Sequence, residues 1–210
     1  MSIATINAEG LVRDVVAIGA SAGGVQPIID LFQQLPADFA ATVMVVLHRS
    51  PFHETSLAEV LGRRASLAVL EPADGAPLTR GVVYVAPRDQ HMIVDDGIVR
   101  LDRGPKQHRT RPAIDPMFRS AAATYGRRVV GVLLSGMGGD GVSGLIEIKH
   151  SGGISLVQSP DEAQFPTMPI RAIKEDDVDC ALTIAEIAKA LCVLAVGGVV
   201  EPGSSLAVAD

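Results

Sequence analysis

The sequence predicts an α/β fold: a doubly wound, mainly parallel sheet with helices on both faces and an antiparallel hairpin at its edge. Short runs of Val, Ile and Leu alternate with segments of helical spacing along most of the 210 residues. Such runs are typical of parallel strands buried on both faces. Aromatic residues make up only 3% of the chain and Trp is absent, so aliphatic side chains must form the core. An Asp-Gly turn between two apolar segments predicts the hairpin.

The first part of the chain predicts two buried strands, each followed by a helix. The expected elements are a strand over 15–18, a helix over 25–35, a strand over 42–47 and a helix over 54–64. In the first helix, apolar residues recur at the i, i+3, i+4, i+7 spacing of a buried helical face. Each strand is too short and too continuously apolar to be an amphipathic helix.

The middle of the chain differs in pattern. Strand-like segments at 82–86 and 92–94 are followed by Asp95-Asp96-Gly97 and a further apolar segment at 98–101. We expect an antiparallel ribbon here, because Asp-Gly favours the two-residue turn that joins hairpin strands. The segment 104–112 is basic and irregular, and we expect a loop.

Helices and strands then alternate again. Asp115-Pro116 is expected to open a helix, with Asp115 as its cap, and Gly126 to close it. The following elements are a strand over 129–134, a helix over 142–150, a strand over 154–158 and a last helix that starts at a Thr183–Glu186 capping box. We expect one domain over 13–195, with flexible termini at 1–12 and 197–210.

Charge and composition exclude several classes of protein. The chain has 18 basic and 24 acidic residues, a net charge of −6, which disfavours a nucleic-acid binder. Two cysteines, Cys180 and Cys192, are too few for a disulfide framework and fit a reducing compartment. The apolar stretch 181–200 contains Glu186 and Lys189 and has amphipathic spacing, so we expect a protein that is not membrane-inserted. Without a secretion signal, the expected location is cytoplasmic.

Three strand ends are followed by side chains that can act as nucleophile, base or acid. Ser21 follows the first strand, His48 follows the second, and Asp140 lies in the glycine-rich turn after 129–134. In open parallel sheets, ligands and reacting groups collect at the carboxyl ends of strands. The sequence therefore predicts a serine, a histidine and an aspartate on the same rim.

Gly19-x-Ser21-x-Gly23 matches the nucleophile elbow, G-x-S-x-G, in its strand–turn–helix setting. Phosphate-binding alternatives do not fit. A dinucleotide motif needs glycine at position 21, and a Walker loop needs lysine where Val25 stands. The simpler alternative is a glycine-rich turn in which Ser21 caps the next helix.

His48 and Asp140 also have structural interpretations. A histidine at a strand end is often a hydrogen-bonded structural residue, and Asp140 is placed to cap the helix that follows it. Four glycines between 136 and 141 would let the loop fold tightly around the Asp140 carboxylate. The spacing of Cys and His does not predict a zinc site. We assign His91, His108 and His150 to the surface or to packing.

Ser21, His48 and Asp140 provide the three residue types of a catalytic triad. The motifs that contain them, taken together with others in the chain, are similar to those of one family. The chain resembles the catalytic domain of CheB, the bacterial chemotaxis protein-glutamate methylesterase, over about residues 13–195. The matching segments occur in family order and are Ala17–Gly24, Leu47-His48, Val85–Met92, Arg111–Asp115 and Leu134–Gly141.

The resemblance implies a serine esterase that hydrolyses glutamate γ-methyl esters on the cytoplasmic helices of chemoreceptors. Whether this chain also deamidates receptor glutamines is left open by the sequence. The triad falls on Ser21, His48 and Asp140. The backbone N–H groups of Ala22 and Met137 are expected to form the oxyanion hole. No metal or organic cofactor is implied. The implied partners are methylated chemoreceptor cytoplasmic domains. For regulation, the alternatives are a separate regulatory protein and an enzyme that is constitutively active.

Departures from the family keep alternatives open. About twelve residues precede the first strand, so the usual N-terminal receiver domain is not expected in this polypeptide, and Ala22 stands where many members have a hydroxyl residue. The alternatives are a non-catalytic signalling module of the same fold and an esterase or deamidase of a non-chemotaxis pathway. A further hypothesis is that the basic loop, with Arg103, Lys106, Arg109 and Arg111, docks on acidic receptor helices.

Overall fold

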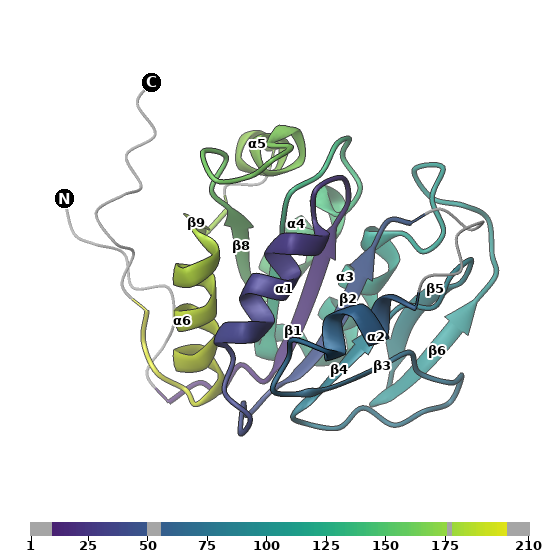
Figure 1. The fold of residues 1–210 in the computed structure, drawn as a ribbon, viewed down its shortest axis with the longest axis horizontal. Coiled ribbons are helices and arrows are strands. Elements are labelled where there is room, and N and C mark those ends of the chain that lie inside the picture. The colour runs from purple at the N-terminus through teal and green to yellow at the C-terminus, as the bar shows by residue number, and fades with distance from the viewer. Residues whose placement is uncertain (1–9, 50–55, 176–177, 201–210) are drawn as a thin grey trace.

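A seven-stranded parallel sheet forms the centre of the computed structural model, which describes residues 10–49, 56–175 and 178–200 (Figure 1). The strand order is β3-β4-β2-β1-β7-β8-β9. The strands are β1 (Val15–Ala20), β2 (Thr42–Leu47), β3 (Ala68–Leu70), β4 (Val82–Val85), β7 (Val129–Leu133), β8 (Ile154–Gln158) and β9 (Cys180–Leu182). All neighbouring pairs are parallel. From β1, the first strand, the sheet grows in one direction through β2, β4 and β3, and later in the other direction through β7, β8 and β9. The border between β1 and β7 is therefore the switch point of the sheet.

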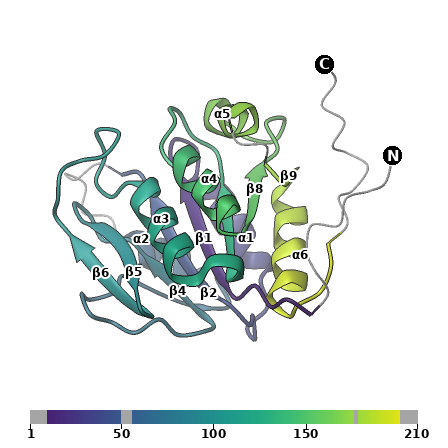
Figure 2. The ribbon, with the colours of Figure 1, turned by 180° about the vertical axis from the view of Figure 1, so that it is seen from behind.

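Helices cover both faces of this sheet (Figures 1 and 2). One face carries α1 (Val25–Gln34), α2 (Leu57–Gly62) and α6 (Ile184–Ala195), and the other carries α3 (Ile114–Tyr125) and α4 (Val142–His150). The helix α5 (Thr167–Glu175) lies beyond the carboxyl end of β8, and a 3₁₀ turn spans Gly126–Arg128. Alternate residues of β1 enter the two cores, Val16 and Ile18 on one side and Val15 and Ala17 on the other. This alternation explains why the strand is apolar throughout.

The predicted hairpin is present and forms a separate two-stranded antiparallel sheet, β5 (His91–Asp95) and β6 (Ile98–Asp102). Asp96 and Gly97 have φ values of 47° and 78°, as a two-residue turn with both central residues left-handed requires. The hairpin is attached to α3, since the Val94 amide donates to Ser120 Oγ at 3.1 Å. The strand-like segment at 82–86 instead forms β4 of the main sheet.

The predicted elements occur within a few residues of their expected ends, but two short strands, β3 and β9, and the helix α5 were not predicted. A strand of three residues is too short to show a periodicity, and Pro169 lies in the first turn of α5. The capping box of α6 is formed as predicted by Thr183 and Glu186. The predicted helix over 54–64 is observed as α2, with residues 54 and 55 outside the described part.

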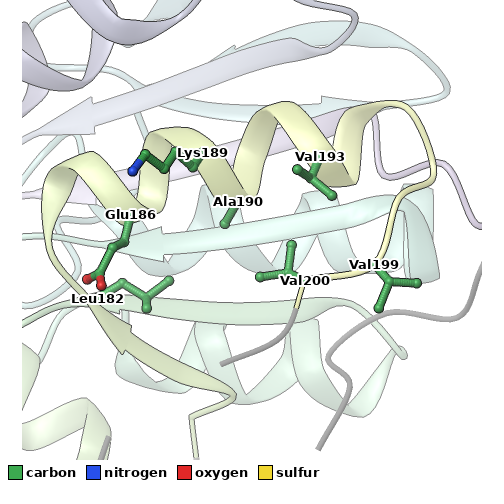
Figure 3. A pocket seen from close by; sticks show the side chains of 7 residues that line it. All are labelled: Leu182, Glu186, Lys189, Ala190, Val193, Val199 and Val200. Atoms are coloured by element: carbon green, nitrogen blue, oxygen red, sulfur yellow. The ribbon is translucent and has the colours of Figure 1, made fainter. Parts of the chain in front are cut away.

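The first and last described segments meet beside α6. Gly10 N donates to Gly197 O at 3.0 Å, while residues 1–9 and 201–210 of the expected flexible termini lie outside the described residues. The segment after α6 returns along the helix and borders a shallow groove (Figure 3), which is lined by Leu182, Glu186, Lys189, Ala190, Val193, Val199 and Val200. Cys180 is buried and Cys192 half-buried, both as free thiols. Within the described ranges, none of the helices combines the length and apolarity that crossing a bilayer requires.

Candidate active site

Ser21, His48 and Asp140 meet at the carboxyl edge of the sheet because their three strands are neighbours. β1 lies between β2 and β7, so the segments that leave these strands emerge side by side. Backbone bonds continue the ladder past the strand ends: His48 N donates to Ala20 O at 3.1 Å and Ser21 N to Ser135 O at 3.0 Å. The predicted rim is therefore present, and it lies at the switch point of the fold.

The His48 imidazole bridges the other two side chains. Its Nδ1 lies 3.1 Å from Ser21 Oγ, and its Nε2 lies 2.6 Å from Asp140 Oδ2. Because an ionised carboxylate can only accept, the Nε2 carries the proton and the Nδ1 lone pair faces the serine hydroxyl. The roles of the two nitrogens are exchanged relative to trypsin-like enzymes, in which Nε2 faces the serine. The His48 side chain is 13% exposed, so solvent still reaches its edge.

Asp140 has a second set of partners at the start of α3. Its Oδ2 accepts from Ile114 N at 2.7 Å, and its Oδ1 accepts from Asp115 N at 3.0 Å. Burial alone would raise the pKa of Asp140, but the hydrogen bonds from His48 and from these two amides outweigh it and hold the pKa below its ordinary value. The carboxylate is thereby kept ionised beside the imidazole.

Asp115, at the start of α3, accepts hydrogen bonds from amides at the start of α4, just as Asp140 accepts them from α3. It was predicted to cap its own helix, but Ala113 is the N-cap of α3, without a side-chain bond. The buried Asp115 Oδ1 instead accepts from Gly141 N at 3.1 Å and Gly144 N at 2.7 Å, at the start of α4. The alternative that Asp140 caps α4 is likewise wrong, since Asp140 caps α3. Each aspartate satisfies the free amides of the other's helix, a reciprocal cap that fixes α3 against α4.

The glycines in the loop after β7 leave room for the Ser21 side chain and for the turn that carries Asp140. A side chain at Gly136 would place its Cβ 2.8 Å from Ser21 Cβ, and Gly141 has a φ of 95°. Ser21 itself does not cap α1, whose N-cap is Gly24 with no side-chain bond. The structural alternative for Ser21 is therefore wrong, and its hydroxyl is available to His48.

The two backbone amides that the resemblance assigns to an oxyanion hole belong to the loops at Ser21. In the described part of the chain, neither Ala22 N nor Met137 N donates to a protein acceptor. The adjacent backbone is well fixed: Gly136 N donates to Phe165 O at 2.9 Å, and Ser135 Oγ donates to Ala22 O at 2.9 Å. Ser135 is fully buried, and sequence reasoning did not single it out because its partners lie far away in the chain.

The other histidines have distinct environments. His91 is buried, with Nδ1 accepting from Ala113 N at 3.2 Å, as its assignment to packing predicts. His108 was assigned in the same way, yet its Nε2 lies 3.0 Å from Asp115 Oδ2, close to the site. Ligand atoms of His108, Asp115 and Asp140 lie within 4.8 Å of one another. The carboxylate oxygens of this cluster already accept amide and imidazole hydrogens, so we attribute it to the reciprocal cap rather than to metal binding.

The basic loop separates into one anchor and three exposed cations. Arg111 donates from Nε and Nη2 to Asp89 Oδ1 at 3.0 and 2.8 Å, and from Nη1 to the carbonyls of Arg103 and Gly104 at 2.8 and 2.7 Å. Its guanidinium is thus committed within the protein. Only the exposed Arg103, Lys106 and Arg109 fit the docking hypothesis.

Comparisons with known proteins agree on one family. The model of the CheB methylesterase family matches residues 16–191. The protein-glutamate methylesterase/protein-glutamine glutaminase of Pyrococcus horikoshii is 38% identical over 179 residues, which cover 83% of this chain and 49% of that protein. A second enzyme of that name, from Anaeromyxobacter dehalogenans, is 40% identical over 178 residues, which cover 85% of this chain and 52% of that protein. The chain spans about half the length of these curated relatives.

A solved structure covers a similar stretch. The crystal structure of the Thermotoga maritima CheB methylesterase catalytic domain matches with a TM-score of 0.81 and 33% identity. The match covers 85% of this chain and 97% of that domain. The resemblance drawn from the sequence motifs is confirmed.

Proposed function

The chain belongs to the CheB methylesterase family, and on that premise we propose that it hydrolyses glutamate γ-methyl esters on the cytoplasmic helices of chemoreceptors. One observation carries the proposal: an unbroken line of hydrogen bonds from the Ser21 hydroxyl through His48 to the buried Asp140. Nucleophile, base and orienting carboxylate at these distances are the parts of an acyl-transfer site.

The reaction follows from these contacts. His48 Nδ1 takes the hydroxyl proton as Ser21 Oγ attacks the ester carbonyl, and Asp140 stabilises the imidazolium. The amides of Ala22 and Met137 bind the oxyanion. The tetrahedral intermediate expels methanol, which takes the proton from His48. Water then attacks the glutamyl–Ser21 ester by the same base catalysis and releases glutamate. A receptor glutamine would lose ammonia in place of methanol.

The direct test measures methanol release from a methylated chemoreceptor. Ser21→Ala should lower the rate about a thousandfold or more, because the nucleophile is lost. Ser143→Ala, at an exposed position of α4, is the matched control and should retain the wild-type rate. Equal methanol release by wild type and Ser21→Ala would refute the assignment. A non-catalytic module of the same fold would release no methanol and would not be labelled at Ser21 by a fluorophosphonate.

The docking hypothesis is retained for the exposed cations of the loop. Arg103, Lys106 and Arg109 stand on the same loop as Thr110, which contacts His48, so an acidic partner bound there would lie close to the site. Reversing all three charges to Glu should weaken receptor binding about threefold or more at low salt, and the difference should fade at high salt. The control is Arg127→Glu, which lies before β7 at the opposite end of the strands. Unchanged affinity at low salt would exclude docking on this loop.

A further inference from the structure

The loop 104–112 contains a tight turn with an unusual backbone. Gln107 and Thr110 exchange both of their backbone hydrogen bonds, at 3.2 and 2.8 Å. Between them His108 and Arg109 have φ values of 48° and 64°. Such turns favour Gly, Asn or Asp at both positions, because a Cβ atom disfavours the left-handed region. The turn therefore holds a conformation that its own residues disfavour, and contacts outside it must stabilise it.

Those outside contacts lead to the candidate active site. His108 Nε2 lies 3.0 Å from the buried Asp115 carboxylate, and the loop beyond the turn is anchored by Arg111 on Asp89. The Thr110 hydroxyl donates to Gln107 O at 3.0 Å, so the lone pairs of its oxygen are left to accept. That oxygen lies 3.4 Å from His48 Nε2.

We propose that Thr110 is a positioning residue for His48, acting as a second acceptor for the Nε2–H that Asp140 already binds at 2.6 Å. The inference rests on the proposed function, in which His48 is the general base. Two acceptors on one N–H fix the rotation of the ring and keep the proton on Nε2, so that the Nδ1 lone pair stays directed at Ser21. The strained turn is the means by which the loop brings the hydroxyl to the imidazole.

The size of the effect follows from the distance. A contact of 3.4 Å is long for a hydrogen bond, so Thr110 supports Asp140 and does not replace it. Loss of one such neutral bond corresponds to about a three- to tenfold change in rate. The effect should appear in the rate of the chemical step and not in binding.

The experiment follows phosphylation of Ser21 by diisopropyl fluorophosphate, in which fluoride leaves as Oγ attacks phosphorus and His48 takes the proton. Thr110→Val keeps the shape and removes the hydroxyl. It should lower the limiting inactivation rate about three- to tenfold while the half-saturating reagent concentration stays unchanged. Thr110→Ser restores the hydroxyl and should restore the rate. Thr124→Val is the matched control, because the half-buried Thr124 also donates to a carbonyl, Val94 O at 3.2 Å, away from the site.

The outcomes separate the two proposals. If the wild type is not labelled at Ser21, the proposed function fails. If the wild type is labelled and Thr110→Val reacts equally fast, only the positioning role is wrong. A Thr110→Ser variant as slow as Thr110→Val would also overturn it, since the hydroxyl would then be irrelevant. Thermal melting of each variant is measured in parallel. If Thr110→Val does not fold, Thr110→Ala replaces it, with the same expected loss of rate.

Discussion

Asp140 serves two purposes with one carboxylate. Its Oδ2 faces the His48 imidazole, and both oxygens accept amides from the first turn of α3. The amide bonds lower the pKa of the carboxyl in spite of its burial, and they also fix the direction in which Oδ2 points. The residue that would stabilise the imidazolium is thus held by a helix that is remote from it in sequence.

Asp140→Asn should therefore damage both the proposed chemistry and the fold. Both carboxylate oxygens of Asp140 accept hydrogen bonds, from His48 and Ile114 N on one side and from Asp115 N on the other. The Asn side chain has only one acceptor oxygen, so its NH₂ group would face a donor on one of the two sides. We expect the free energy of unfolding to fall by about 1–3 kcal/mol. Hydrolysis should fall by about 10⁴-fold, as for a triad aspartate. Chemical denaturation and methanol release measure the two effects.

Asp115→Asn is the control for this prediction. Asp115 is equally buried and caps α4, but none of its hydrogen bonds involves His48. It should lose a similar amount of stability and much less activity. Similar losses of activity in both variants would argue against the role of Asp140 beside His48.

At the scale of elements, the Arg111 guanidinium anchors the loop 104–112, alongside the contact between His108 and Asp115. Arg111 makes four hydrogen bonds, two to Asp89 and two to loop carbonyls, and it precedes the segment that leads into α3. Together with the contact between His108 and Asp115, this anchoring explains how an exposed and highly charged loop keeps a turn with two left-handed residues.

Arg111→Lys should disrupt the loop although it conserves the charge. A lysine cannot reproduce the planar fork of donors, so several of the four bonds would be lost. We expect the free energy of unfolding to fall by about 1–3 kcal/mol and Ser21 to react more slowly with a fluorophosphonate. Denaturation and labelling rates measure this. Arg103→Lys, at an exposed position, should change neither, and an equal effect of both variants would contradict the anchoring role.

At the scale of the whole molecule, buried carboxylates hold the two ends of the sheet. Asp140 lies at the carboxyl end, and Asp14, 1% exposed, precedes β1 at the other. Burial would raise the pKa of Asp14, but hydrogen bonds from Arg128 and Arg80 outweigh it and lower the pKa. Both groups therefore resist protonation in the folded protein.

These shifts predict the pH dependence of stability. In the unfolded chain an aspartate takes up a proton near pH 3.9, whereas Asp14 and Asp140 in the folded protein do so only at lower pH. Their stabilisation is therefore complete above about pH 5 and is lost as the pH falls below about 4. Denaturation at a series of pH values should show this loss. Asp14→Asn should have a smaller acid-induced decrease, and an unchanged decrease would exclude Asp14 as a source.

Much of this architecture could be predicted from local patterns. Continuous apolar runs identified β1, β2 and β7, because a strand buried on both faces needs no polar residue. The candidate site followed from a further rule, that parallel strands end at one edge. Ser21, His48 and Asp140 could be proposed together because each follows such a strand.

The sequence by itself determined the alternation of strands and helices, the hairpin turn and the identity of the three rim residues, since these depend on neighbours within a few positions. Only the tertiary structure decided that Asp140 and Asp115 cap each other's helices, that Arg111 is an anchor, and that Thr110 reaches His48. Asp140 and Thr110 lie 25 or more positions from these partners. The hydrogen-bond partner of a polar side chain depends on how whole helices and strands pack together. A pattern of neighbouring residues contains no information about that packing.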